Sequence, residues 1–485
     1  MADKQGTIKL DSYNLHVNDI VVNVDIFLER NAFVPSYNIS ILNISKITDI
    51  ILHKIREEFV SKINIGDIKI TDTGDPNVIK EKFTKEIFVL IKKYFPDIDK
   101  KTSNLLINYL IQENIGLGNV EILLRDSNLE DIVINNAHDP VWVYHRKHGW
   151  LKTNVRVLTE SKIRHYSTMI GRDVGKEITL LKPLMDASLS TGDRVNATLS
   201  PISTMGNTIS IRKFAEKPWT ITDFIKGKTI SYYGAALIWL AVQNELSILI
   251  TGGTGSGKTS MLNVVSNFFP PNQRIISIED TRELTLPDSL HWVPLETRLP
   301  NPEGKGEVTM LDLLVNSLRM RPDRIIVGEI RRKREAEVLF EAMHTGHSVY
   351  ATLHANNARE TIVRMTNPPI EIPKLMLPAL SLIVVQHRDR RIGVRRTLQI
   401  AEVLPNGDPN VLLQLDAQKD QLNQINESKV LMDTINLYTG LTIEEIKEDI
   451  DEKINILKWL VSNNITNIHQ MGLIFAKYYI KTLKH

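Results

Sequence analysis

One stretch, residues 247 to 260, constrains the chain more than any other. An apolar run from Ile248 to Ile250 is typical of a buried parallel strand, and the pattern Gly-x-x-x-x-Gly-Lys-Thr follows it at once. Four of the six positions from 252 to 257 are glycine, which lets backbone N–H groups crowd around phosphate oxygens. The helix expected next offers free N–H groups and a positive dipole end. The stretch predicts a phosphate-binding loop for a nucleoside triphosphate, made of Gly252, Gly253, Thr254, Gly255, Ser256, Gly257, Lys258, Thr259 and Ser260.

Two side chains of this loop have a defined chemistry in nucleotide sites. Lys258 is placed to reach the β- and γ-phosphates, and the hydroxyl of Thr259 can ligate Mg²⁺. We therefore expect Mg²⁺ to accompany the triphosphate.

Two acidic residues follow β-branched runs downstream of the loop. Glu279 ends the run that begins at Arg274, and Glu329 follows the run that begins at Arg324. In a parallel sheet, ligands bind at the carboxyl ends of the strands, so both carboxylates should face the loop. Strand ends also carry acids for solubility, but hydrolysis needs acids near Mg²⁺ and a group that activates water. The pair therefore favours a hydrolase over a simple nucleotide binder.

Two histidines, His347 and His354, flank another β-rich run. A metal site is one interpretation, but no cysteine and no tight set of carboxylates accompanies them. A purely structural role is the second interpretation. Near a γ-phosphate, an imidazole can donate a hydrogen bond, so we expect the pair to sense the phosphate.

Composition limits the class of protein. The chain has 485 residues, of which 42% are hydrophobic and 24% charged, as in ordinary globular proteins. Its 59 Lys and Arg against 57 Asp and Glu leave a net charge of +2, which does not favour a nucleic-acid partner. With no cysteine, disulfides and thiol chemistry are excluded. We expect a cytoplasmic protein that reaches the membrane only through a partner, because no signal peptide or long apolar run is present.

Changes of periodicity divide the chain into five predicted parts. Strand–helix alternation in the fourth part predicts a parallel sheet covered by helices, with strands at 247–251, 274–278, 324–328 and 348–353 and a hairpin at 381–387 and 396–403. A capping box at Thr442 and Glu445 begins a helix near the end. The parts are a mainly helical region at 1–116 (with strands as an alternative before residue 43), a small α/β domain at 117–215, a linker at 216–229, the sheet domain at 230–403, and a polar connection with terminal helices at 404–485.

Taken together, these motifs resemble the secretion-ATPase superfamily, which powers type II secretion, type IV pili and the archaellum. The loop, the Glu279-Asp280 pair, Gly328-Glu329 and the two histidines occur in the family's order over residues 117 to 403. Stretches such as Leu129-Glu-Asp-Ile are most similar to the archaeal branch. The lack of cysteine departs from many bacterial members, which carry a zinc-binding Cys₄ insertion. The first 116 residues match weakly.

The resemblance implies an α/β fold in which a RecA-like P-loop NTPase domain follows a small, PAS-like α/β domain, with helical additions at both ends. It also implies ATP as the nucleotide and a homo-hexameric ring. Glu279 would orient or deprotonate the attacking water, and Glu329 would hold Mg²⁺ directly or through water; the two could exchange roles. His347 and His354 would sense the γ-phosphate.

Two arginines match those that reach the nucleotide from the N-terminal domain of the family. They are Arg194, in Arg-Val-Asn-Ala, and Arg212, in Ile-Arg-Lys-Phe. Arginines of this kind stabilise transition-state charge and contribute about 10³–10⁵ in rate in other NTPases. The alternative is that each forms an ordinary surface ion pair.

The function that the resemblance implies is a motor ATPase. Hydrolysis would drive assembly or rotation of a type IV pilus-like filament, archaellum or pilus, through a polytopic inner-membrane platform protein and other motor components. The alternatives are a type II-like secretion ATPase, a RecA-type nucleic-acid translocase and a nucleotide-gated scaffold. A basic run from His387 to Arg396 is either a solvated hairpin or a docking site for acidic loops of the platform.

Overall fold

The computed structural model divides into two units, residues 1–216 and 217–485, each of which is described by itself. The two units carry separate hydrophobic cores. The structure describes residues 7–17, 20–30, 32–41, 46–64, 76–115, 117–189, 191–214, 217–300, 304–389 and 391–482.

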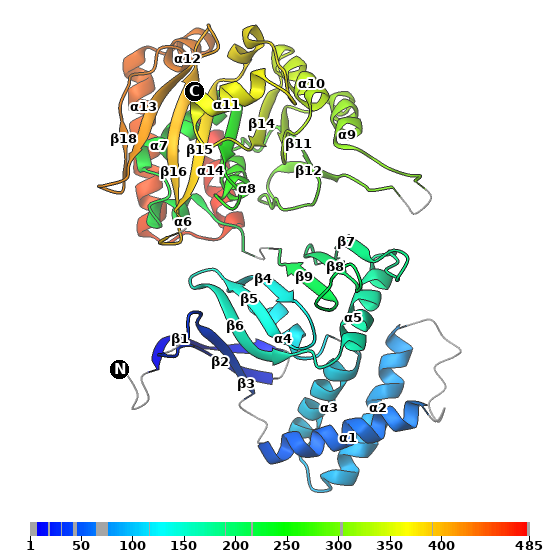
Figure 1. Ribbon diagram of the computed structural model, residues 1–485. Helices are drawn as coiled ribbons and strands as arrows, with labels where there is room; N and C mark the ends of the chain where they lie inside the picture. The colour runs from blue at the N-terminus through cyan, green and yellow to red at the C-terminus, as the bar shows by residue number, and fades with distance from the viewer. Residues whose placement is uncertain are drawn as a thin grey trace. The chain divides into compact units, whose positions relative to one another are not determined.

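The first unit is built on a nine-stranded sheet in the order β1-β2-β3-β6-β5-β4-β9-β8-β7 (Figure 1). Its strands are β1 (Ile8–Val17), β2 (Ile20–Leu28), β3 (Ser36–Ile41), β4 (Leu129–Ile134), β5 (Pro140–His145), β6 (Gly149–Arg156), β7 (Leu184–Ser188), β8 (Arg194–Thr198) and β9 (Thr208–Arg212). Strand β3 pairs with β6 in parallel, with Ser36 opposite Lys152. The sheet therefore crosses the boundary predicted at residues 116 and 117, and the strands before residue 43 belong to it.

The described residues of this unit form the helices α1 (Lys46–Asn64), α2 (Pro76–Tyr94), α3 (Lys100–Ile115), α4 (Asn119–Arg125) and α5 (Glu160–Asp173). The first three pack around a core that includes Ile55, Phe59 and Ile87, each at most 1% exposed. The rings of Phe59 and Phe83 meet edge to face at 5.1 Å. The helical part of the predicted N-terminal region is therefore present. It packs against the strands before residue 43, which the sequence indicated only as an alternative.

The second unit has a nine-stranded sheet in the order β12-β11-β13-β14-β10-β15-β16-β17-β18. Pairing is parallel from β12 to β15 and antiparallel beyond it. The strands are β10 (Ile248–Gly252), β11 (Arg274–Glu279), β12 (His291–Glu296), β13 (Arg324–Val327), β14 (Ser348–Leu353), β15 (Leu382–Asp389), β16 (Val394–Val403), β17 (Pro409–Asp416) and β18 (Gln421–Gln424). The predicted α/β class, the parallel sheet and the hairpin are confirmed.

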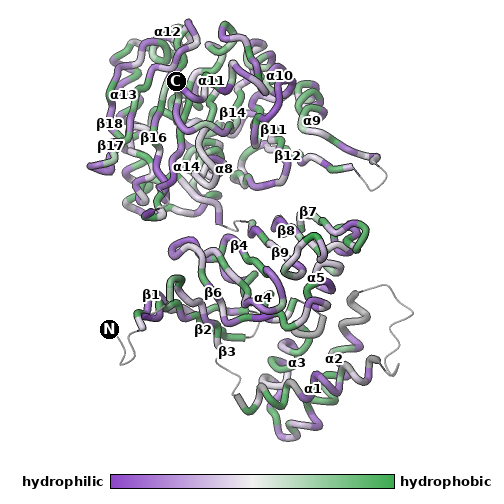
Figure 2. Tube along the Cα trace, in the orientation of Figure 1, coloured by the Kyte–Doolittle hydropathy of each residue, from purple (hydrophilic) through white to green (hydrophobic). Residues whose placement is uncertain are grey.

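Helices cover both faces of this sheet (Figure 1). They are α6 (Ile221–Lys226), α7 (Tyr232–Gln243), α8 (Lys258–Ser266), α9 (Met310–Ser317), α10 (Lys333–His344), α11 (Ala358–Thr366), α12 (Leu431–Thr439), α13 (Ile443–Ser462) and α14 (Ile468–Thr482), with 3-10 turns at Leu318–Met320 and Lys374–Ala379. Hydrophilic and hydrophobic bands alternate along α13 in Figure 2, as expected of a helix with one buried face.

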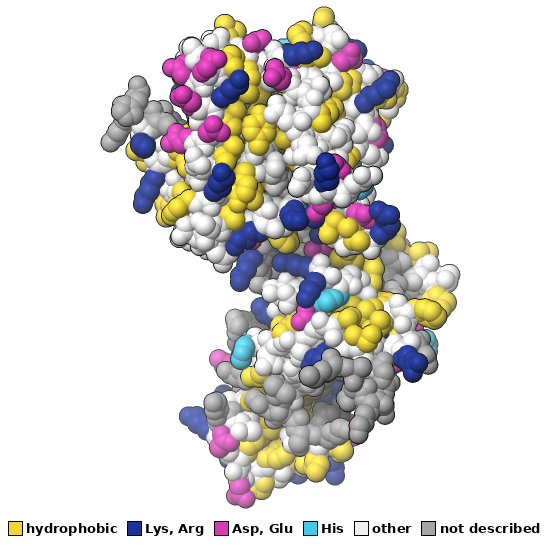
Figure 3. Space-filling view, turned by 90° about the vertical axis from the view of Figure 1, so that its left-hand side faces the viewer, with side chains coloured by type: hydrophobic (Ala, Val, Ile, Leu, Met, Phe, Trp, Pro, Cys, Tyr) yellow, Lys and Arg dark blue, Asp and Glu magenta, His cyan; other side chains and the backbone are white. Residues whose placement is uncertain are grey.

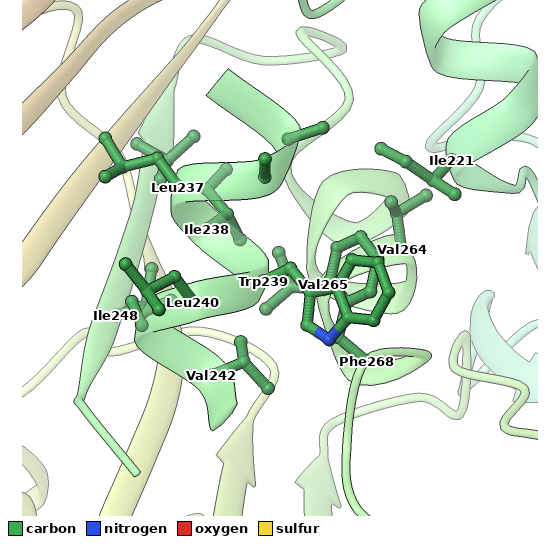
Figure 4. Close-up of a cluster of buried hydrophobic side chains, with 14 of the residues drawn as sticks. Ile221, Leu237, Ile238, Trp239, Leu240, Val242, Ile248, Val264, Val265 and Phe268 are labelled. Carbon is green, nitrogen blue, oxygen red and sulfur yellow. The ribbon is translucent and has the colours of Figure 1, made fainter. Parts of the chain in front are cut away.

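Aromatic rings tie the helices on one face together, within a cluster of buried hydrophobic side chains in which Figure 4 shows Trp239 and Phe268. Trp239 of α7 stacks on Phe268, which follows α8, with ring centroids 5.4 Å apart. Phe475 of α14 meets both rings edge to face, at 4.8 and 5.1 Å. Tyr479 accepts a hydrogen bond from Trp239 Nε1 at 2.9 Å and donates one to the carbonyl of Phe268 at 2.6 Å. Helix α14 is therefore part of the core of the second unit.

Two segments differ from the expectation. The predicted linker at 216–229 contains α6, which Thr220 begins through a capping box with Asp223, and Ile221 is fully buried in the core of the second unit. The predicted irregular connection after residue 403 forms β17 and β18 instead. Turn residues and polar side chains dominate both segments, so their hydrophobic periodicity is weak. The second segment forms strands because β17 pairs with β16, and β18 pairs with β17.

Candidate functional site

The phosphate-binding loop is shaped by glycines at positions where no other residue fits. A Cβ atom on Gly252 would lie 2.3 Å from the carbonyl oxygen of Gln386 in β15. Gly257 caps α8 in the left-handed conformation, with φ +94°, and supplies no side-chain hydrogen bond to the first turn. The N–H groups that open α8 are thus not satisfied by a side-chain cap, which is the arrangement that favours an anion.

Lys258 projects along this loop toward β14. Its Nζ donates to the carbonyls of Gly252 and Gly253 at 3.1 and 3.2 Å, and lies 3.2 Å from Nδ1 of His354. Burial lowers the pKa of Lys258 from its ordinary value, while Glu329 counteracts the shift. The ammonium group is therefore positioned between the loop and the histidine predicted to sense phosphate.

Glu279 ends β11 as a buried carboxyl, only 3% exposed. Its Oε1 accepts hydrogen bonds from the backbone N–H groups of Glu283 and Leu284, at 2.9 and 3.2 Å. Its Oε2 is buried and has no hydrogen-bond partner within the described part of the chain. Burial raises the pKa of Glu279 to about 7. A carboxyl that gains and loses a proton near neutrality suits general-base chemistry.

Glu329 lies at the same edge of the sheet, because β11 and β13 are neighbours and Gly328 donates its N–H to Ile278 at 2.8 Å. Its Oε1 is 3.0 Å from Nε2 of His354. Its Oε2 accepts from Arg331 at 2.7 and 3.0 Å, and Arg331 also pairs with Asp280. One arginine thus joins the acids that follow two adjacent strands.

His354 links the lysine to this acid. Burial, and then the charge of Lys258, lower its pKa, so the ring is neutral at neutral pH. A neutral imidazole has one donor and one acceptor nitrogen. The contacts fit Nδ1 accepting from Lys258 and Nε2 donating to Glu329. A continuous polar chain therefore runs from the phosphate-binding loop to Arg331.

His347 lies elsewhere. It precedes β14, whereas His354 follows it, so the strand separates the two residues by roughly 23 Å. Its Nδ1 lies 3.2 Å from the carbonyl of Ala342 and 3.2 Å from Oγ1 of Thr345, at the amino end of the strand. The structure therefore does not bring His347 to the loop of its own chain, whereas His354 contacts Lys258 of that loop.

Arg194 and Arg212 belong to the first unit. They stand opposite each other on β8 and β9. Arg194 forms two hydrogen bonds with Asp186, at 2.7 and 3.1 Å, and Arg212 one with Asp131 at 3.0 Å. Both side chains are more than half exposed, at 51% and 71%. The two arginines share one face of the sheet, and each forms an ion pair there.

Magnesium requires oxygen ligands, and the site offers them. Thr259 is in the first turn of α8, and the Glu329 carboxylate, 20% exposed, lies at the edge of the sheet. Among the residues that the structure describes, no group of three or more His, Asp and Glu is arranged to hold a metal ion. Thr259 and Glu329 fit a hard cation that keeps water and phosphate oxygens as its other ligands.

Arg331 is the site residue that sequence reasoning missed, although it stands two positions after a predicted acid. We expect Arg331→Ala to lower kcat for ATP hydrolysis by about 10²-fold, because Glu329 would lose the group that orients it. Arg334→Ala is the matched control, since Arg334 pairs with Glu337 on the surface of α10. Phosphate release at saturating ATP measures both variants. Equal activity in the two would show that Arg331 only neutralises surface charge.

Comparisons with known proteins place the chain in a family. Residues 116–408 match the family described as "Type II/IV secretion system protein". An uncharacterised protein of Methanocaldococcus jannaschii, MJ0900, is 33% identical over 444 residues, which are 88% of this chain and 78% of that protein. The type IV secretion system protein PtlH of Bordetella pertussis is 30% identical over 307 residues, covering 56% of this chain and 89% of PtlH.

Among solved structures, the VirB11 ATPase of the Brucella suis type IV secretion system aligns with 62% of this chain and 97% of its own, at 24% identity and a TM-score of 0.31. The family assignment rests on the sequence matches. No helix within the described ranges is both long and apolar enough to span a membrane.

Proposed function

Because the chain belongs to the family of type II/IV secretion system proteins, we propose that it is an ATP-driven motor of a pilus-like or secretion machine. The observation that carries the proposal is the polar chain at the carboxyl edge of the sheet, in which Lys258 contacts His354 at 3.2 Å and His354 contacts Glu329 at 3.0 Å. A loop that only bound nucleotide would not need it.

The proposed reaction is attack of water on the γ-phosphorus, with ADP as the leaving group. Glu279 takes the proton of the attacking water, since its buried carboxyl has a pKa of about 7 and one oxygen without a hydrogen bond in the described residues. Lys258 and the N–H groups at the start of α8 bind the phosphates. Mg²⁺ held by Thr259 and Glu329 would neutralise phosphate charge.

His354 then reports the γ-phosphate. Its ring already bridges the loop lysine and Glu329. A γ-phosphate that engages Lys258 competes for the same ammonium group, so the histidine's hydrogen bonds change with the state of the nucleotide. The change starts at β14, in the middle of the sheet.

Motion would follow from the two units. We propose that Arg194 and Arg212 approach the phosphates of ATP from the first unit and release them after hydrolysis. Their position opposite each other on β8 and β9, with side chains more than half exposed, supports this role. The hinge would lie close to residue 216, where the two units meet in sequence, because α6 is packed into the second unit. We further propose a homo-hexameric ring in the cytoplasm that acts on a polytopic membrane platform and serves an archaellum or pilus.

Phosphate release by the full-length chain tests the proposal. We expect Mg²⁺-dependent turnover of ATP that single- or double-stranded DNA does not stimulate, because the net charge is only +2 and acidic and basic side chains share the surface (Figure 3). Stimulation by DNA would favour a translocase, and ATP binding without turnover would favour a scaffold. Co-purification with a polytopic membrane protein would test the partner.

A further inference from the structure

The hairpin of β15 and β16 lies beside the phosphate-binding loop, on the side away from the catalytic acids. In the sheet order, β10 has β14 on one side and β15 on the other. Gly252 at the end of β10 is level with Gln386 of β15. The hairpin continues past that point, and Arg388 and Arg395 stand opposite each other where the loop begins.

Both arginines contact the loop. Arg395 Nε donates to the carbonyl of Gly255 at 3.1 Å. A Cβ atom on Gly255 would lie 3.0 Å from Nη1 of Arg388, and one on Gly257 would lie 3.4 Å from Cδ of Arg395. The bare glycines therefore let two guanidinium groups approach the loop closely. Gly255, at φ +72°, has a backbone conformation that also favours glycine.

The other described arginines of this basic run have a different setting. Arg391 pairs with Asp389 at 2.9 Å in the turn, and Arg396 pairs with Asp420 at 2.6 Å. Residue 390 lies outside the described residues. The hairpin is thus more than a solvated basic surface, because two of its arginines are directed at the nucleotide-binding loop.

The orientation of a bound nucleotide can be inferred from the two strands that flank β10, which are β14 and β15. The proposed function places the γ-phosphate on the β14 flank, where Lys258, His354 and Glu329 form the polar chain. A triphosphate is a linear chain, so its nucleoside lies at the end opposite to the γ-phosphate. That end points toward the β15 flank, where the arginines are.

We propose that Arg388 and Arg395 form the nucleoside end of the ATP site, with a guanidinium plane stacked on the purine base; this assignment rests on the proposed function. Guanidinium groups are planar and weakly hydrated, and they stack on aromatic rings. Arg395 is fixed for this role by its hydrogen bond to Gly255. The two arginines are binding residues and take no part in proton transfer.

Equilibrium binding to the full-length chain separates the nucleoside from the phosphates. ATP and inorganic tripolyphosphate, which lacks a nucleoside, are titrated calorimetrically in EDTA so that no hydrolysis occurs. We expect Arg395→Ala and Arg388→Ala each to weaken ATP binding by up to about tenfold and to leave tripolyphosphate binding unchanged. Arg395→Lys keeps the charge but loses the plane, so it should lose most of the same affinity. Arg391→Ala, in the turn of the same hairpin, is the control and should bind both ligands normally.

The tripolyphosphate titration also shows that each variant retains a folded loop. Equal losses for ATP and tripolyphosphate would place the arginines on the phosphates, or on the loop itself, and would overturn the proposal. Unchanged ATP affinity in both alanine variants would overturn it as well. Phosphate release in Mg²⁺ is measured separately on the wild-type chain. If the variants lose ATP binding selectively but the wild-type chain hydrolyses no ATP, the nucleoside site is retained and the motor function is rejected.

Discussion

Lys258→Ala is expected to abolish ATP turnover while the chain stays folded. The ammonium group donates to the carbonyls of Gly252 and Gly253, and it lies beside His354. Its loss removes the charge that meets the β- and γ-phosphates, and we expect kcat/KM to fall by about 10³-fold or more. Single-turnover release of phosphate measures the loss.

The fold should tolerate this change. Burial already lowers the pKa of Lys258, so the protein gives up favourable hydration to keep the charge in place. Lys333→Ala is a matched control, because Lys333 pairs with Glu371 at the surface. Thermal unfolding followed by circular dichroism should show similar melting temperatures for the wild type and both variants. Turnover by the Lys258 variant at the wild-type rate would reject the assignment of the loop.

Glu279→Gln is expected to bind ATP normally and hydrolyse it about 10²–10⁴-fold more slowly, because the amide cannot accept the proton of water. The two backbone hydrogen bonds to Oε1 can be kept by the amide oxygen, so the loop that follows β11 stays in place. Glu296→Gln is the control, since Glu296 is level with Glu279 on the edge strand β12 and is exposed. A normal rate for the Glu279 variant would transfer the role of base to Glu329.

The pH dependence gives a second signature of Glu279. Burial raises its pKa to about 7, and the base must be deprotonated, so wild-type kcat should rise as pH increases through about 7. The residual activity of the glutamine variant should lack this rise. Because the pKa is raised on folding, the group's contribution to stability is fully present below its unfolded pKa and is lost as pH rises through about 7. The variant should therefore melt at a higher temperature relative to wild type at pH 8 than at pH 5.

Local sequence was sufficient to predict the glycine-rich loop, the parallel strands and the acids at the ends of these strands. Glycine spacing, β-branched runs and the position of Glu279 and Glu329 are all set within a few residues of chain. Arg331 could not be predicted in the same way, because its role depends on Asp280 in a neighbouring strand connection. The opposite placement of His347 and His354 was implicit in the run between them, since a strand separates its two ends.

Long-range pairing accounts for the other differences. The strands before residue 43 extend a sheet whose remaining members lie more than 80 residues later, and only the β3–β6 register reveals it. The segment 216–229 is rich in turn-forming residues, yet Thr220 begins a helix there and Ile221 anchors it in the core. The basic hairpin was recognised as a charge cluster, whereas its contact with Gly255 needed the order of the strands.

The aromatic cluster fixes the C-terminal end of α8, the helix that follows the phosphate-binding loop. Helix α8 has nine residues and is about 13 Å long, with its first turn at the phosphates and Phe268 just beyond its last. Phe268 is stacked on Trp239 and held by Tyr479 of α14. Because α8 is short and its far end is packed in the aromatic cluster, movement of its first turn must either shift that cluster or be taken up by the sheet. Helix α14 is thereby connected to the start of α8 through Phe268, although the two are far apart in the sequence.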